Sequence, residues 1–492
     1  MSRHGVYPSE VVPPRSKYSA VGRFGRLFGE LPPFAADTAD VRAALLEIGK
    51  PEGIMDARDD LTQPVAGPTS DQPVSVRNSD NPTLTAGFTF LGQFLGHDMT
   101  ADPTSSLERQ VDPEQITNFR TPGFGLDNVY GAGPAASPHL YDTQSGKGGK
   151  FLLEPTGTPG KFDLPRNSQN IALVGDVRDD ENLITGQLHV AFLKFHNAVV
   201  ERVKTTLIDS AEIFAEAQRI VRWHYQWIIV HEFLRKTCGA DVVDDVLANG
   251  RKFYHWRNEP FIPVEFSVAA FRFGHSQVRP AYRANFTGNA GDPFIAPFLT
   301  PAPSNPNDPD DLSGGCRAPR RFVDWQSFFD FGDGNVGQNK KIDTTLSTTL
   351  FRLPGTFVPN PNPKTNPASL AQRNLLRHLT FSLPSGQRVA RAMKLPELSR
   401  GDLDDLKPYG LDDRTPLWFY ILREAQVLQN GERLGPVGAR IVTEVCIGLL
   451  EGDKASYLAQ DPDWQPFLPT IDASKNGDDF RMVDLLRFAE VA

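Results

Sequence analysis

Cysteine is scarce in this chain, which has 492 residues and only Cys238, Cys316 and Cys446. Three widely separated cysteines argue against a disulfide framework, and no pair has the spacing of a metal site. No stretch approaches the run of about 18 apolar residues that a membrane-spanning helix needs. The first residues also lack the apolar segment of a cleaved signal peptide. We therefore expect a soluble protein without disulfides, either cytoplasmic or exported by a leaderless route.

An excess of positive charge is also missing. The chain has 51 basic and 60 acidic side chains, a net charge of −9, and the two signs are scattered along it. This pattern argues against a nucleic-acid partner and against binding to an acidic membrane surface. Neither a phosphate-binding loop, a dinucleotide fingerprint nor the nucleophile turn of a serine hydrolase occurs. The sequence thus predicts none of these common enzyme classes.

Phenylalanine, by contrast, is abundant. There are 33 Phe against 10 Tyr, and hydrophobic residues make up 39% of the chain, which indicates a large apolar core with apolar cavities. Residues 1–80 are rich in Pro, Gly and Asp and contain one predicted helix at 40–49. We interpret residues 1–80 as an extended arm that packs on the main body, and residues 81–492 as that body, a single large domain.

Apolar residues recur at helical spacing over two long segments, 183–207 and 210–237. Shorter helices are predicted at 370–377 and 436–450. Long irregular stretches rich in Pro, Gly and Asn separate the helices at 101–170, 285–320 and 353–368. Since strand-like alternation never persists, the prediction is a mainly α fold, a large single helical domain with long irregular loops and little or no sheet.

Ten histidines are candidates for chemistry. His189 and His196 stand seven residues apart on one predicted helix, and so do His224 and His231 on the next. Helical metal ligands usually have a tighter spacing, and no Glu or Cys completes a site beside either pair. The better interpretation of all four is a histidine that is hydrogen-bonded in the core.

His97 and His275 have a different setting. Gln93 precedes His97 by one helical turn, so both side chains can point into one cavity. His275 ends an apolar run, Phe266–Phe273 followed by Gly274, and an imidazole in such surroundings suits a haem iron ligand whose second nitrogen bonds a fixed acceptor. The amide oxygen of Asn374 could be that acceptor.

Arg178 lies in a polar turn just before the helix at 183–207. Beside a dry cavity its permanent charge would favour negative charge that develops on oxygen. A surface salt bridge with Asp176, Asp179 or Asp180 is the alternative, and the sequence leaves both open.

Several ordered motifs together resemble the animal-type haem peroxidases of the peroxidase–cyclooxygenase superfamily, in particular bacterial relatives of myeloperoxidase and lactoperoxidase. The resemblance runs from about Leu84 to the C-terminus, about four-fifths of the chain. The segments that carry it are 121–131, 174–181 with His189 and His196-Asn197 behind it, 261–266, 271–275, 374–387 and 447–453.

The resemblance implies a role for seven residues. His97 matches the distal histidine, Gln93 the distal glutamine, Arg178 the distal arginine, His275 the proximal iron ligand, Asn374 its hydrogen-bond acceptor, Arg377 the partner of a haem propionate, and Glu181 a carboxylate that some relatives link to a haem methyl. The implied cofactor is haem b, covalently linked if Glu181 reacts. The implied partners are hydrogen peroxide and small electron donors.

The implied activity is reduction of hydrogen peroxide with oxidation of iodide, bromide, thiocyanate or phenolic donors. Chloride is not expected, because Asn182 replaces the methionine that forms a sulfonium bond in myeloperoxidase. A fatty-acid dioxygenase would need a radical-forming tyrosine three residues before the proximal histidine, where this chain has Arg272. A non-catalytic haem-binding or adhesion protein is a further alternative, but it would not be expected to keep Gln93, His97 and Arg178.

A calcium ion is also implied by the resemblance. Its expected ligands are the side chains of Asp98, Thr121 and Asp127 and the carbonyl of Gly123. Gly125 stands where the family has a further aspartate, so one carboxylate is missing from a cation that favours six to eight oxygens.

Overall fold

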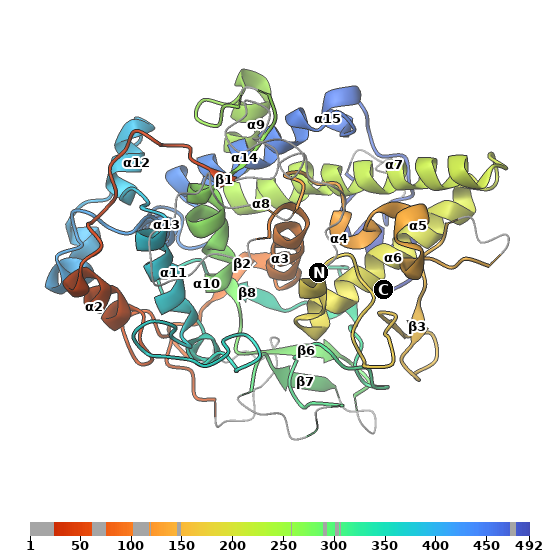
Figure 1. Ribbon diagram of the computed structural model, residues 1–492, viewed down its shortest axis with the longest axis horizontal. Coiled ribbons are helices and arrows are strands. Elements are labelled where there is room, and N and C mark those ends of the chain that lie inside the picture. The colour runs from red at the N-terminus through yellow and green to blue at the C-terminus, as the bar shows by residue number, and fades with distance from the viewer. Residues whose placement is uncertain are drawn as a thin grey trace.

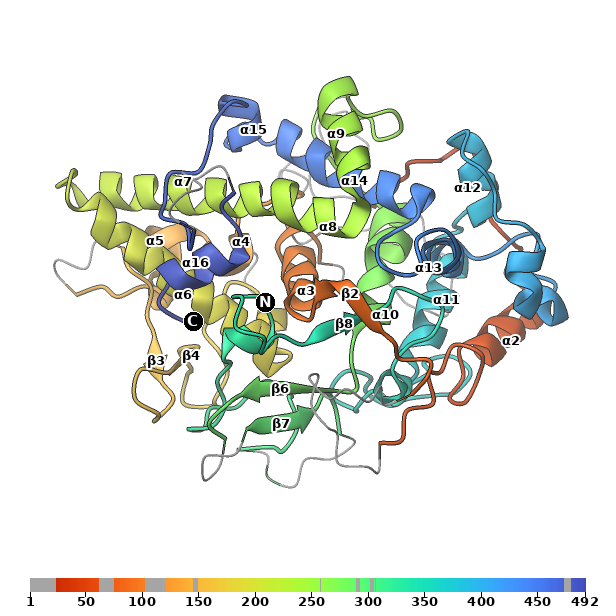
Figure 2. The ribbon, with the colours of Figure 1, turned by 180° about the vertical axis from the view of Figure 1, so that it is seen from behind.

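A computed structural model describes residues 24–61, 75–101, 118, 120–144, 149–256, 258–288, 293–300, 305, 307–472 and 479–492. Figures 1 and 2 show a body built mainly of helices. The α-helices are α2 Ala39–Ile48, α3 Gly87–Met99, α4 Asp127–Tyr130, α5 Gly133–Ala136, α6 Leu183–Val203, α7 Ser210–Ile228, α8 Leu234–Cys238, α9 Ala240–Asn249, α10 Gly274–Gln277, α11 Leu370–Thr380, α12 Gly386–Ala392, α13 Leu417–Leu428, α14 Pro436–Gly452, α15 Tyr457–Gln460 and α16 Met482–Phe488. The predicted mainly α fold is confirmed.

Short turns of other helical geometry link these elements. The 3₁₀ turns are η2 Pro138–Leu140, η3 Val177–Asp180, η6 Ala270–Phe273, η7 Trp325–Ser327, η8 Thr348–Phe351 and η9 Gly401–Tyr409, and the π turns are η4 Ile229–Phe233 and η5 Glu265–Ala269. The turn η4 joins α7 to α8, so the helix predicted at 210–237 is one continuous helical run with a π turn near its end.

The described strands form four two-stranded sheets, each too small to build a layer. Strands β1 Phe24–Gly25 and β5 Ile262–Pro263 are parallel. The antiparallel pairs are β2 Asp80–Thr85 with β8 Gln338–Lys340, β3 Glu154–Pro155 with β4 Phe162–Asp163, and β6 Ala281–Asn285 with β7 Phe294–Pro297. The expectation of little sheet holds for the described residues.

The two long helices begin at capped ends. The Asn182 side chain accepts a hydrogen bond from the backbone of Thr185 at the start of α6, and the Asp209 side chain accepts two at the start of α7. Such caps satisfy amides that have no partner within the helix. The two helices pack along each other, with α3 beside them in the middle of the molecule (Figures 1 and 2).

Helix α3 is apolar on most of its circumference, as its buried Phe88, Phe90, Leu91, Phe94 and Leu95 show. A helix that is apolar nearly all round is buried in a core. Because α3 is surrounded by other elements, polar side chains on it are held in fixed positions.

The described part of the predicted arm lies on the body. Ser369, the N-cap residue of α11, and Gln372 within α11 donate side-chain hydrogen bonds to the carbonyls of Gly49 and Leu46 at the end of α2. The Glu265 carboxylate accepts from the backbone of Leu27 at 3.0 Å. Residues 1–23 and 62–74 of the arm lie outside the described residues, and its boundary at residue 80 stays a prediction. Within the described ranges, no helix has the length and apolar character needed to cross a membrane.

Candidate functional site

A largely apolar cavity of about 380 Å³ lies between α3, the segment 178–182 and the helical run that carries His275. Phenylalanine and leucine side chains form much of its wall, together with His97, Gln93, Arg178, Glu181 and His275. The volume is within the range of about 300–1,000 Å³ found for small-molecule and cofactor sites. Five of the predicted site residues therefore share one cavity.

One face of α3 forms the first wall. Gln93 and His97 lie one turn apart, as do Gly92 and Gly96, and all four line the cavity. A Cβ on Gly92 would be in ordinary contact with the ring of Phe233 at 3.5 Å, and one on Gly96 with the ring of Phe271 at 3.7 Å. The polar residues of this wall thus stand beside two glycines that are packed against aromatic rings.

Arg178 lies on the turn η3, at the rim of the cavity. Its guanidinium donates to Asp176 at 2.7 Å and to the backbone carbonyls of His97 and Thr100 at 3.0 and 2.6 Å. Although burial alone would lower its pKa, the ion pair with Asp176 raises the pKa of Arg178. The salt bridge with Asp176 that the sequence left open is present, and it holds Arg178 at the cavity; its role toward negative charge on oxygen stays a prediction.

The turn η3 also carries Asp179, which the sequence interpretation treated only as a possible salt-bridge partner of Arg178. Its carboxylate is fully buried and accepts from Nδ1 of His97 at 2.8 Å, from Nδ1 of His189 at 2.7 Å and from the amide of Asn128 at 3.0 Å. Burial alone would raise its pKa, but the hydrogen bonds of His189 and His97 hold the pKa of Asp179 below its ordinary value.

His275 faces the same cavity from the other side, at the start of α10. The run that carries it changes from π geometry in η5 to 3₁₀ geometry in η6 before α10 begins. Such π turns are frequent at functional sites. Burial and the nearby Arg272 lower the pKa of His275 to about 3, so the neutral imidazole, the form that binds metals, is favoured.

Asn374 contacts His275 as expected, but its amide is turned the other way. Its Nδ2 lies 2.8 Å from Nδ1 of His275, while its oxygen accepts from Arg272 at 2.7 Å. The expectation that the amide oxygen accepts from His275 is therefore wrong for this arrangement. The cause is Arg272, because a guanidinium has only donors and takes the amide oxygen.

Arg377, from α11, lines a smaller neighbouring cavity of about 150 Å³. Arg178 and Arg272 line it as well. Three guanidinium groups therefore line this smaller cavity, and their positive charge would stabilise carboxylates bound there.

Glu181 follows η3 and lines the main cavity. One carboxylate oxygen accepts from the amide of Gln93 at 3.3 Å and lies 4.0 Å from Nε2 of His97. Burial raises the pKa of Glu181, while the charge of Arg178 lowers it in part.

The predicted calcium ligands lie beside this site. The two carboxylate oxygens of Asp98 accept from the backbone of Asp127 at 2.8 Å and of Leu126 at 3.0 Å. Burial and the charge of Asp127 raise the pKa of Asp98 to about 8. Among the described residues no three His, Cys, Asp or Glu side chains gather as metal ligands, so a cation here would depend on hydroxyl and carbonyl oxygens as well.

Of the remaining paired histidines, His196 and His224 are hydrogen-bonded in the core, as predicted, and His231 is hydrogen-bonded but half-buried. His196 contacts the hydroxyl of Tyr130 at 3.0 Å, and His224 contacts the carbonyl of Ile220 at 2.7 Å. His231 contacts the hydroxyl of Tyr457 at 3.3 Å.

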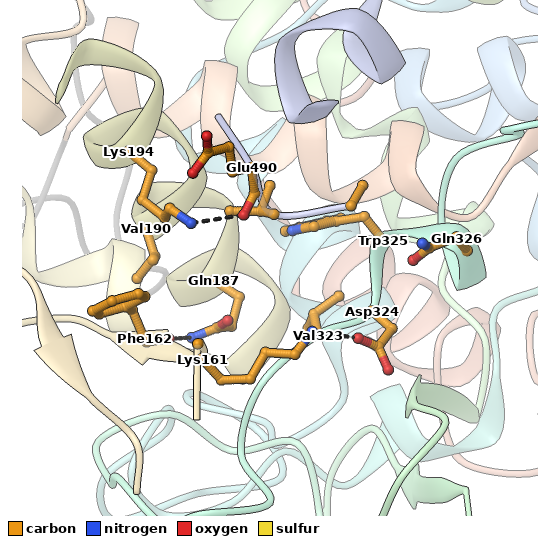
Figure 3. A pocket seen from close by; sticks show the side chains of 13 residues that line it. Lys161, Phe162, Gln187, Val190, Lys194, Val323, Asp324, Trp325, Gln326 and Glu490 are labelled. Carbon is orange, nitrogen blue, oxygen red and sulfur yellow. Dashed lines mark hydrogen bonds and ion pairs between the residues drawn. The ribbon is translucent and has the colours of Figure 1, made fainter. Parts of the chain in front are cut away.

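A second cavity of about 240 Å³ lies between α6 and the segment 323–326 (Figure 3). Its two lysines have partners: Lys161 pairs with Asp324 at 2.7 Å, and Lys194 donates to the carbonyl of Glu490 at 2.7 Å. It contains none of the predicted site residues. The cavity between His97 and His275 is therefore the candidate site.

Comparisons with known proteins give a consistent family. The family model described as animal haem peroxidase matches residues 105–293. Peroxidasin of Drosophila melanogaster is 23% identical over 402 residues, which cover 74% of this chain and 24% of that protein. Thyroid peroxidase of Sus scrofa is 27% identical over 213 residues, which cover 38% of this chain and 23% of that protein. The chain thus spans less than a quarter of the length of these two relatives.

Two solved structures show that the fold is shared more widely. Peroxidase A from Dictyostelium discoideum aligns with a TM-score of 0.58 and 19% identity, covering 89% of either chain. Oryza sativa fatty acid alpha-dioxygenase aligns with a TM-score of 0.59 and 14% identity, covering 100% of this chain and 85% of that one. At such low identity these two likenesses concern the fold alone.

Proposed function

We propose that this chain, which matches the animal haem peroxidase family model over residues 105–293, is a peroxidase that reduces hydrogen peroxide while oxidising small electron donors at the cavity between His97 and His275. The observation that carries the proposal is the meeting of His97, Arg178 and His275 in one cavity. These residues come from three separate segments of the chain.

The residues present suit haem b. His275 offers a neutral imidazole within an apolar wall, and the guanidinium groups of Arg377 and Arg272 line the adjoining space, where propionates would be stabilised. We propose His275 as the iron ligand and Arg377 as a propionate partner. Asn374 would orient His275 with its amide turned so that its oxygen accepts from Nδ1, because the contact of its NH₂ with Nδ1 would leave the proton on Nε2, the nitrogen needed for iron. Bound there, haem would supply the iron and the two electrons that cleave the O–O bond.

On the opposite wall, His97 is the proposed general base and acid. It would take the proton from one oxygen of hydrogen peroxide and return it to the other oxygen, which leaves as water. Arg178 would stabilise the negative charge that develops on the departing oxygen. Gln93, one turn before His97, would hold a water or a halide beside it.

The first test is the substitution His97→Ala. Because the base is lost while His275 is untouched, we expect reaction with peroxide to slow by about 10²- to 10⁴-fold at unchanged haem content. The measurement is stopped-flow absorption after addition of peroxide to the haem-loaded protein. A variant that reacts at the rate of the parent would refute the proposed role.

The proposed donors are iodide, bromide, thiocyanate and phenols. Asn182 at the position after Glu181 cannot form the sulfonium bond that goes with chloride oxidation, and it instead caps α6. We also propose that Glu181, which lines the cavity, can link haem covalently. Steady-state rates with each donor, and the mass of the same sample after denaturation, test both points; efficient chloride oxidation or fully released haem would contradict them.

A fatty-acid dioxygenase is the alternative within the same fold. Such an enzyme needs a tyrosine three residues before the iron ligand, and that position is Arg272, which is hydrogen-bonded to Asn374 and to the carbonyl of Ser267. A non-catalytic haem-binding protein is the other alternative, and it offers no reason to retain both His97 and Arg178. The peroxidase proposal is therefore better supported than either.

Calcium is part of the proposal. Asp98, next to His97, lies near the charge of Asp127, and a cation would offset the burial and the repulsion that together raise the pKa of Asp98. Thr121 and the carbonyl of Gly123 are the proposed further ligands, with water in place of the carboxylate that Gly125 lacks.

A further inference from the structure

The buried carboxylate of Asp179 joins two histidines from different helices. His97 comes from α3 and His189 from α6, and each donates from Nδ1 to a different oxygen of the carboxylate. The amide of Asn128, from α4, adds a third donor on the oxygen that His189 uses. All three contacts are between buried groups, so water does not compete with them.

These contacts determine which nitrogen of His97 carries its proton. An ionised carboxylate only accepts hydrogen bonds, so Nδ1 of a neutral His97 must be the protonated nitrogen. Nε2 is then left without a proton. Since Nε2 lies 4.0 Å from the Glu181 oxygen, on the cavity side of the ring, it is the nitrogen that substrate can reach.

The chain holds Asp179 rigidly in this place. The preceding Asp176 accepts from the backbone of Arg178 and from the side chains of Arg178 and Arg120. Gly175 has no room for a side chain, because a Cβ there would lie 2.4 Å from the carbonyl oxygen of Asn128. The turn that carries Asp179 is thus held by the ion pairs of Asp176 and by the close backbone packing at Gly175.

We infer that Asp179 is a positioning residue for peroxide cleavage: it holds His97 in the tautomer whose Nε2 is free to accept a proton, and His189 and Asn128 hold Asp179. This inference rests on the proposed role of His97. Asp179 also stabilises the imidazolium that forms when His97 takes the proton, because its negative charge lies against the ring. His189 is then part of the site and not only of the core.

The substitution Asp179→Asn tests the inference. The Asn oxygen will turn to the side where His189 and Asn128 both donate, which places its NH₂ against Nδ1 of His97. His97 must then move its proton to Nε2 and loses its free base. We expect reaction with peroxide to slow by about 10²- to 10⁴-fold, measured by stopped-flow absorption of the haem-loaded protein.

The matched control is Asp180→Asn, one residue along the same turn. Asp180 pairs with Arg166 through two bonds of 2.6 and 2.8 Å and contacts neither histidine. We expect it to lower the unfolding temperature while the rate with peroxide stays within a few-fold of the parent. An equal loss of rate in both variants would assign Asp179 a merely structural role.

A double-mutant cycle separates the inference from the proposed function. If Asp179 acts through His97, then His97→Gln combined with Asp179→Asn reacts no more slowly than His97→Gln alone. Losses that multiply would overturn the inference and leave the role of His97 intact. A normal rate in His97→Gln alone would overturn the proposed function itself.

A spectroscopic readout needs no turnover. In histidine-¹⁵N-labelled protein, as the diamagnetic ferrous carbon monoxide complex, the signal that His97→Gln removes must show Nδ1 protonated and Nε2 unprotonated. Asp179→Asn must reverse this pattern. Finding Nε2 protonated in the parent would overturn the inference. This measurement needs only the parent protein, so it stays decisive if the Asp179→Asn variant fails to retain haem.

Discussion

At the scale of single residues, two buried carboxylates at the site, Asp179 and Asp98, have pKa values that are shifted in opposite directions. Both accept three hydrogen bonds, but two of the donors to Asp179 are histidines, which hold its pKa below the ordinary value, whereas burial and the nearby charge of Asp127 raise the pKa of Asp98 to about 8. A buried acid keeps its charge only where donors or a cation stabilise it. At Asp98 the two backbone amides and the Tyr225 hydroxyl do not offset burial and the charge of Asp127, which a bound cation would do.

We therefore predict that Asp127→Asn removes bound calcium. The parent should hold about one calcium per chain, and a chelator should lower its unfolding temperature, because binding to the folded state stabilises it. Binding should weaken as the pH falls below about 8, since Asp98 must lose its proton to act as a ligand. Elemental analysis and thermal unfolding check this, with the exposed Asp461→Asn as control. A parent free of calcium after purification in its presence would contradict the prediction.

At the scale of helices, α14 begins without a capping side chain of its own, since its N-cap residue is Gly435. Glu424, from the neighbouring α13, takes this role: one carboxylate oxygen accepts from the backbone of Val437 at 2.9 Å and of Gly438 at 3.4 Å. Burial raises the pKa of Glu424 to about 8. A helix end is thus stabilised from another helix by a group that titrates near neutral pH.

The pKa of Glu424 is higher in the folded than in the unfolded chain, where it is about 4.3. Its favourable contribution is complete below about pH 4 and is lost as the pH rises through about 8. We predict that the parent loses up to about 1.4 kcal/mol of unfolding free energy per pH unit relative to Glu424→Gln in this window. Apparent unfolding temperatures between pH 5 and 8 measure this difference, and the exposed Glu30→Gln serves as control. A constant gap between parent and variant across the window would disprove it.

At the scale of the whole molecule, the cavity is assembled from segments that are far apart in sequence. Its walls come from α3, the turn η3 and the run 265–277, while α11 places Asn374 behind His275. Helix α3 lies in the middle of the body in both views (Figures 1 and 2). The site therefore depends on the complete domain, and no single helix carries it.

Local patterns predicted the helices well. The apolar periodicity of 183–207 and 210–237 corresponds to α6 and to the run from α7 to α8. Side-chain spacing along one helix depends only on helix geometry, which is why Gln93 and His97 could be assigned to one face. The resemblance to a family supplied the partners in other segments, which periodicity cannot reveal.

The sequence by itself determined the residue types of the site. These are a histidine in an apolar run (His275), a histidine one helical turn after a glutamine (His97), and an arginine in an acidic turn (Arg178). Only the tertiary structure decided how they are used. It turned the oxygen of Asn374 toward Arg272, gave Arg178 a fixed salt bridge at the cavity rim, and bound His97 to Asp179. The reason is physical: the direction of a hydrogen bond depends on every donor within reach, and those donors come from distant segments of the chain.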